Sequence, residues 1–336
     1  MQDDKQYDDP KELNEDQLSC LNDETDGEYK KTKTSIKIPM PWRYKRYYMF
    51  GLATVLTLIL PWIQINGNHF FLLSFDKLKL HLAFVQFDMQ ELYLMPFLLM
   101  FMFLGVFGMT VMGGRVFCGW VCPQTVFRVI YRDFIETKIL RLRKRIKNKQ
   151  QEPDMSLREN KIKKAVAMLI ALVLAFVAAA NFMWFFIPPE DFFPYLADYS
   201  NHWTVVGILV GIALFLVYDI TILKEDFCGY ICPYSRIQSV LYDEHTVMAL
   251  YNTDRGGDIF DENHNKQFTK YKDLLKVDPT AECNTCESCV TVCPTHIDIR
   301  KGLQLECINC LECVDACTTV MGKLGKPSLV TWSSEY

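Results

Sequence analysis

Four apolar stretches restrict the folds open to this chain more than any other feature. They cover residues 47–65, 92–112, 165–187 and 203–223 and contain almost no charged residues. Each has roughly 20 residues, which at about 1.5 Å per residue is enough to cross a hydrocarbon core about 30 Å thick. A large soluble protein could bury one such helix, but four in succession favour an integral membrane protein.

Basic residues are concentrated on one side of the predicted spans. The segment before the first span and the 128–164 connection are rich in Lys and Arg, whereas the 66–91 loop has only Lys77 and Lys79 and the 188–202 loop has neither. The positive-inside rule therefore predicts that both termini are cytoplasmic. Residues 124–149 mix apolar and basic side chains, and we expect either a helix along the anionic inner leaflet or a solvated helix.

The composition divides the chain into four predicted regions. Residues 1–40 are polar and predict a disordered cytoplasmic tail, 41–250 a membrane domain, 251–281 a polar linker, and 282–336 a small domain rich in cysteine. The predicted fold class is a mainly α membrane protein. It consists of a four-transmembrane-helix bundle of two hairpins and a small cytoplasmic α+β domain of the bacterial two-cluster ferredoxin type.

The cysteines of the C-terminal region have the spacing of iron–sulfur ligands. One run is C-x-x-C-x-x-C-x-x-x-C-P and a second repeats it without the proline. In bacterial two-cluster ferredoxins the fourth cysteine of each run ligates the other cluster. Zinc sites are the alternative, but they usually pair C-x-x-C with a distant second pair. The spacing assigns one [4Fe–4S] cluster to Cys283, Cys286, Cys289 and Cys317, and the other to Cys307, Cys310, Cys313 and Cys293.

A second cysteine motif occurs twice in the membrane domain. Residues 117–123 read FCGWVCP and residues 227–233 read FCGYICP, each after the cytoplasmic end of a predicted span. Residues four apart share one face of a helix, so symmetric packing of the hairpins would bring four thiols together. Soft sulfur ligands suit Cu(I), zinc or an iron–sulfur centre. Inert buried cysteines and a redox dithiol are the alternatives. The candidate catalytic and copper-binding residues are Cys118, Cys122, Cys228 and Cys232.

One ionisable residue lies inside a predicted span. Asp219 is in the fourth apolar stretch, one turn before Lys224. It is either a functional group or an interfacial charge.

Four stretches resemble one known family. FCGWVCPQTVF, FCGYICPYSRIQS, CPTHIDIRKGLQLECINCLECVDAC and PWIQINGNHF are similar to the CcoG/FixG (RdxA) cytochrome oxidase accessory proteins. The resemblance implies a bacterial inner-membrane polyferredoxin that supports assembly of cbb3-type oxidases by reducing Cu(II) to Cu(I), with the paired C-x-x-x-C-P cysteines as the copper or redox site. Such proteins usually continue into a fifth transmembrane helix and an immunoglobulin-like domain, and this chain stops before either, so we expect a fragment or a protein without that periplasmic contact.

The leading hypothesis is therefore a membrane-bound cupric reductase. Its expected partners are a cytoplasmic electron donor, copper ions, copper-delivery or oxidase assembly proteins, membrane lipid and, as a further possibility, a second copy of the chain in a homodimer. No nucleic-acid partner is expected. A quinol dehydrogenase subunit of the NapH type, which shares paired C-x-x-x-C-P motifs, and a copper-binding chaperone without enzymatic activity are the alternatives.

Overall fold

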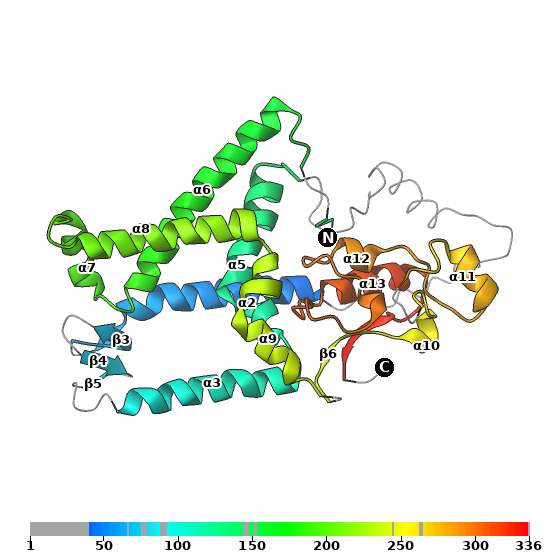
Figure 1. Ribbon diagram of the computed structural model, residues 1–336, viewed down its shortest axis with the longest axis horizontal. Helices are drawn as coiled ribbons and strands as arrows, with labels where there is room; N and C mark the ends of the chain where they lie inside the picture. Colours follow the sequence, from blue (N-terminus) through cyan, green and yellow to red (C-terminus); the bar gives the residue numbers. More distant parts are fainter. Residues whose placement is uncertain are drawn as a thin grey trace.

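The computed structural model describes residues 40–65, 67–74, 79–82, 84–87, 93–143, 148–150, 153–243, 245–261 and 265–334 (Figure 1). The predicted disordered tail, residues 1–40, lies outside the described residues except for Met40. Membrane-type helices and the small strands β3–β5 occupy one part of the molecule, and the cysteine-rich C-terminal domain (described residues between 248 and 334) occupies the other.

Three helices in the described part are long and apolar enough to cross a membrane. They match the second, third and fourth predicted spans. These are α3 (Leu94–Gly113), α6 (Arg158–Met183) and α8 (Trp203–Tyr218), the last continued by the π-helix η4 (Asp219–Leu223).

The first predicted span is only partly helical. Helix α2 (Trp42–Ile59) ends in a 3-10 turn, η1 (Leu60–Trp62), and the chain then forms strand β1 (Gln64–Ile65). Pro61 lies in this turn and has no N–H to continue the helical hydrogen bonds. The prediction of a helix through residue 65 is therefore wrong.

The predicted four-helix bundle is not what the structure shows. Helices α6 and α8 pack closely, because alanines recur every fourth residue on the buried face of α6. Ala175 and Ala179 lie against α8, and Ala167 and Ala171 continue this face against η3 and η4. Helix α3 lies apart from this pair (Figure 1), and its apolar side chains are mostly exposed, as expected for a helix that faces lipid. Helix α2 packs instead on the connecting helix α5 through Phe50, Val126 and Val129.

The segments that connect the spans are folded. Residues between α2 and α3 contribute short antiparallel strands, and helix α7 (Pro189–Ala197) lies between α6 and α8. Besides β1, the strands are β2 (Asn68–His69), β3 (Phe71–Ser74), β4 (Lys79–Leu82) and β5 (Val85–Phe87), paired β1–β2 and β3–β4–β5.

Much of the described part of the connection after the first cysteine motif, residues 124–143 and 148–149, is buried, which contradicts both expectations for this segment. Helix α5 (Pro123–Val129) runs into a π-helix, η3 (Ile130–Ile139), whose Tyr131 and Ile135 pack against α6 and Ile220. Its Arg132, Asp133 and Glu136 form buried ion pairs, and only Lys138 among its charged residues is exposed.

The C-terminal domain begins earlier than predicted. Residues 251–281 are not a linker, because Tyr251, Ile259, Leu274 and Ala281 belong to the same buried core as Cys283. Strand β6 (Met248–Tyr251) pairs with the last strand of the chain, so this segment closes the domain. Its other elements are α10 (Thr253–Gly256), α11 (Tyr271–Val277), α12 (Ser288–Thr291), η6 (Ile299–Lys301), α13 (Glu312–Lys323) and β7 (Val330–Ser333).

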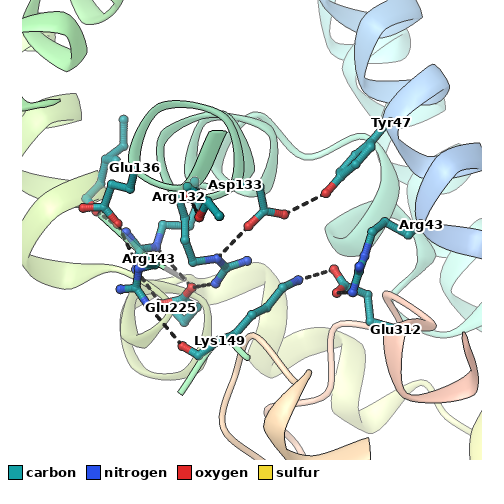
Figure 2. Close-up of polar contacts among 12 residues, drawn as sticks. Arg43, Tyr47, Arg132, Asp133, Glu136, Arg143, Lys149, Glu225 and Glu312 are labelled. Carbon is teal, nitrogen blue, oxygen red and sulfur yellow. Dashed lines mark hydrogen bonds and ion pairs between the residues drawn. The ribbon is translucent and has the colours of Figure 1, made fainter. Parts of the chain in front are cut away.

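Buried ion pairs attach the C-terminal domain to the helices (Figure 2). Glu312, at the start of α13, is 0% exposed and accepts hydrogen bonds from Arg43 (2.8 Å), Arg46 (2.7 Å) and Lys149. Asp315 accepts the N–H groups of Trp42 and Arg43 at 2.8 and 2.9 Å, so the domain supplies a carboxylate to the N-terminus of α2.

Candidate functional site

Four cysteines of the C-terminal domain line one cavity, and they are the four that the spacing assigned to the first cluster. Cys283 and Cys286 precede α12, Cys289 lies in it, and Cys317 comes from α13. Arg300 lines the same cavity. The fold therefore brings together the crossed set, and ligation of a cluster by this set stays a prediction.

The second set is also gathered. Cys313 interacts electrostatically with Cys310, Cys307 and Cys293, which is the remaining crossed combination. Cys313 also interacts with Cys289 of the first set, so the two sets are neighbours.

The two cysteine runs share an unusual backbone. The residues that flank the middle cysteine have positive φ in both runs, at Thr285 and Glu287 in the first (53° and 54°) and at Asn309 and Leu311 in the second (51° and 60°). Alternation of such residues with ordinary ones points successive N–H groups into a concavity that suits anionic groups, including iron–sulfur sites. Side chains other than glycine adopt this conformation at an energetic cost, so its repetition fits a shared ligand.

The raised pKa values of these thiols also fit a bound group with a positively charged iron core. Burial raises the pKa of the Cys307 thiol to about 12 and raises that of Cys289 and Cys313 well above the ordinary value. Thiolates in this environment need a positive counter-charge, which iron supplies. The donor set therefore fits two [4Fe–4S] clusters.

The two membrane-domain motifs have equivalent backbones. Cys118 lies in helix α4 (Val116–Trp120) and Cys228 in the π-helix η5 (Phe227–Ile231), and each motif closes with a 2.9 Å bond from its second cysteine N–H to its phenylalanine carbonyl. Cys122 and Cys232 are the N-caps of α5 and α9 (Pro233–Val240). The prolines therefore start helices, because the first N–H groups of a helix have no internal partner.

The four motif cysteines converge, as the repeat predicted. Burial, with smaller contributions from Cys122, Cys228 and Cys232, raises the pKa of the Cys118 thiol to about 12. Burial likewise raises the pKa of Cys228 to about 12, with Cys122 and Cys232 adding to the shift. We call this group the four-cysteine site. Asp219 is 2% exposed and interacts with Cys122 and Cys228, so it belongs to the surroundings of this site.

The loop of the second cluster set packs directly on the four-cysteine site. Cys118 shares a buried cluster with Ile308 and Cys310. A Cβ at Gly119 would lie 2.5 Å from the Ile308 carbonyl oxygen, so only glycine allows this approach. Trp120 Nε1 donates to the Asn309 carbonyl (3.2 Å), and Asn309 Nδ2 donates to the Gly113 carbonyl (2.9 Å).

No group of three or more His, Cys, Asp or Glu side chains within the described residues is arranged to hold one metal ion. The structure therefore contains no ready-made copper site at the four cysteines.

Several residues of the site carry no motif and were missed by sequence reasoning. Gln238 accepts from the Cys118 thiol (3.4 Å) and donates to Thr110 (3.2 Å), which is 3.0 Å from the Tyr234 hydroxyl. Arg115, three residues before Cys118, was also missed. Only a comparison of the flanks of the two motif copies could have indicated Arg115.

Comparison with known proteins agrees with this geometry. A 4Fe–4S dicluster domain model matches residues 223–335, and a 4Fe–4S binding domain model matches residues 95–147. The chain is 30% identical to nitrogen fixation protein FixG of Rhizobium meliloti over 308 residues, 84% of this chain and 54% of that protein. It is 26% identical to protein RdxA of Cereibacter sphaeroides over 309 residues, 85% of this chain and 59% of RdxA. The chain belongs to the FixG/RdxA family.

The similarity covers only part of the length of each relative. Protein RdxB of Cereibacter sphaeroides is 28% identical over 296 residues, again 85% of this chain and 59% of the relative. This FixG/RdxA-family chain thus spans between 54% and 59% of the length of these relatives. No solved structure matches it. It is an iron–sulfur protein with helices suited to a membrane.

Proposed function

We propose that this chain is a cupric reductase of the bacterial inner membrane, in support of cbb3-type oxidase assembly. The observation that carries the proposal is the contact between the two cysteine systems, in which Ile308 and Cys310 pack against Cys118. Clusters held by the C-terminal domain would supply single electrons, and each Cu(II) that becomes Cu(I) takes one. A cytoplasmic one-electron donor replaces each electron.

The chain's own residues favour Cu(I) as the product. Four thiols converge at the end of α4, and soft sulfur ligands prefer Cu(I) to Cu(II). The distribution of Lys and Arg supports a cytoplasmic position for both termini and for the C-terminal domain. The small strands between α2 and α3 would then lie on the periplasmic side.

A third iron–sulfur cluster is the second candidate for the four-cysteine site. It is favoured by the 4Fe–4S binding model over residues 95–147, because that match includes Cys118 and Cys122. Electron transfer would then continue through iron, and the acceptor would be a different species.

Copper and iron stoichiometry on anaerobically purified protein separates these possibilities. The comparison is wild type against the variant Cys118→Ala/Cys122→Ala/Cys228→Ala/Cys232→Ala. The proposal predicts copper in the wild type, loss of copper in the variant, and equal iron in both. Loss of iron in the variant would favour the third cluster, and absence of copper above background from both proteins would reject the copper site and make quinol the next electron donor to test.

A further inference from the structure

Arg115 is a buried cation without a carboxylate partner. It is 2% exposed, and among the residues that the structure describes it is the one buried arginine with no ion pair. Its Nη2 donates to the neutral Ser235 carbonyl (2.6 Å), and its Nε has no hydrogen-bond partner. A buried charge left in this state is strongly unfavourable unless an anion lies nearby.

The position of Arg115 identifies that anion. Burial raises the pKa of the Cys118 and Cys307 thiols, and Arg115 opposes the rise in both. The guanidinium is therefore close to both Cys118 and Cys307, and Cys118 itself packs against Cys310 of the second cluster set. A cluster bound by four thiolates carries net negative charge, which supplies the partner that the described protein groups do not.

The first cluster set has a different electrostatic environment. Arg300 lines its cavity, but Asp298 neutralises it with Oδ1 2.8 Å from Nε and Oδ2 2.6 Å from Nη2. Glu287 lies 3.6 Å from the same guanidinium. The second set therefore faces an uncompensated cation, and the first set faces a compensated one.

The internal repeat shows that the motif fold does not require an arginine at this position. Gly114 and Lys224 precede the two motifs with nearly the same backbone, φ 59° and ψ −134° against φ 52° and ψ −130°. The next residue is Arg115 in the first copy and Glu225 in the second, so the same backbone accepts either charge. The positive charge occurs only in the copy that packs on Cys310.

We propose that Arg115 makes the second cluster site the more easily reduced of the two, and so directs electrons from the first site toward the four-cysteine site. Reduction adds one negative charge, and a nearby unpaired cation stabilises the reduced form. Arg115 acts on the second site through its positive charge, next to the cysteine ligands. It is therefore a positioning residue and not a catalytic one. The inference rests on the proposed function only in requiring that both sites hold [4Fe–4S] clusters; it does not depend on copper.

The test is a redox titration followed by electron paramagnetic resonance, without copper, on wild type, Arg115→Lys and Arg115→Met. Cys286→Ala and Cys310→Ala, which each remove one predicted ligand, assign the two reduction steps. In Arg115→Met we expect the reduced-to-oxidised ratio of the second site at fixed potential to fall at least about tenfold, equivalent to about 59 mV for one electron. Arg115→Lys should keep most of the wild-type value, and the first site serves as internal control.

A second variant keeps the test decisive if Arg115→Met loses iron. Asp298→Asn removes the charge that neutralises Arg300 and leaves one acceptor oxygen. It should therefore raise the reduction potential of the first site and reduce the difference in potential between the two sites. Arg143→Met controls for loss of a buried guanidinium away from the cysteines and should shift neither step. Equal potentials of the two wild-type sites, or equal shifts of both sites in Arg115→Met, would overturn the proposal.

Discussion

Gly119 shows how one missing side chain can join two redox systems. The Ile308 carbonyl occupies the space that a Cβ would take at this position, which lets the loop between Cys307 and Cys310 reach the four-cysteine site. Its counterpart in the second motif, Gly229, has the Glu306 Cγ at 3.9 Å and no tighter contact. Two glycines with the same place in a repeated motif therefore have different structural roles.

This difference gives a matched pair of variants. Gly119→Ala should push the Ile308 loop away from α4 and slow electron transfer between the clusters and Cu(II) about tenfold or more, since a misplacement of about 1 Å can cost up to about a hundredfold in rate. Gly229→Ala should stay close to wild type. Stopped-flow reoxidation of reduced protein measures both rates, and equal rates in the two variants would contradict the role of the contact.

The raised thiol pKa values make Cu(I) binding dependent on pH. Burial and the neighbouring thiols raise the pKa of Cys118 and Cys228 to about 12, so both are protonated at neutral pH and must lose a proton to bind metal. Affinity should therefore rise as pH rises, by about a hundredfold per unit if both protons are released. Competition with a Cu(I) chelator at pH 6, 7 and 8 measures this, and an affinity independent of pH would contradict thiolate ligation by these residues.

At the scale of elements, helix α13 both carries Cys317 and attaches its domain to the helices. Although burial raises the pKa of Glu312, Lys149, Arg46 and Arg43 together hold it well below its usual range. A carboxyl whose pKa is lowered by folding stabilises the fold at neutral pH, and this stabilisation is lost as pH falls. In the connection 124–149, expected at a surface, Arg128, Arg132 and Lys149 are buried and pair with Glu225, Asp133 and Glu312.

Loss of this ion-pair group should detach the domain. Glu312→Gln leaves Arg46 and Lys149 buried without a counter-charge, and we expect a loss of about 3–5 kcal/mol in stability. Thermal unfolding of the detergent-solubilised protein, with limited proteolysis near residue 150, measures the effect. Glu159→Gln removes an exposed i,i+4 pair with Lys163 and should leave Tm unchanged. Similar Tm values for the two variants would show that the group does not hold the domain.

At the scale of the whole molecule, the sequence predicts what depends on local spacing and misses what depends on packing. Apolar length located three membrane-type helices, and cysteine spacing predicted both crossed sets and the convergence of Cys118 with its three partners. The end of α2 at Pro61, the folded segment 251–281 and the separate position of α3 were missed. The folding of the segment after β6 depends on contacts between residues far apart in the chain, such as β6 with β7, and the position of α3 depends on packing. The end of α2 has a local cause, Pro61, which the apolar length alone did not reveal.

Arg115 illustrates the same limit within the site. An arginine before a cysteine motif has many ordinary explanations, and its lack of a carboxylate partner is visible only when the surrounding side chains are placed. The role of Gln238 likewise depends on α9 lying against Cys118.

In the proposed reaction, electrons leave the C-terminal domain through the four-cysteine site to Cu(II). The most direct test is anaerobic mixing of dithionite-reduced, desalted protein with stoichiometric Cu(II), following cluster absorbance and trapping Cu(I) with a chelator. We predict rapid reoxidation with one Cu(I) per electron in the wild type, and little reoxidation in the quadruple Cys118→Ala/Cys122→Ala/Cys228→Ala/Cys232→Ala variant with its iron intact. Equally fast reoxidation in both proteins would show that electrons reach Cu(II) without the four-cysteine site.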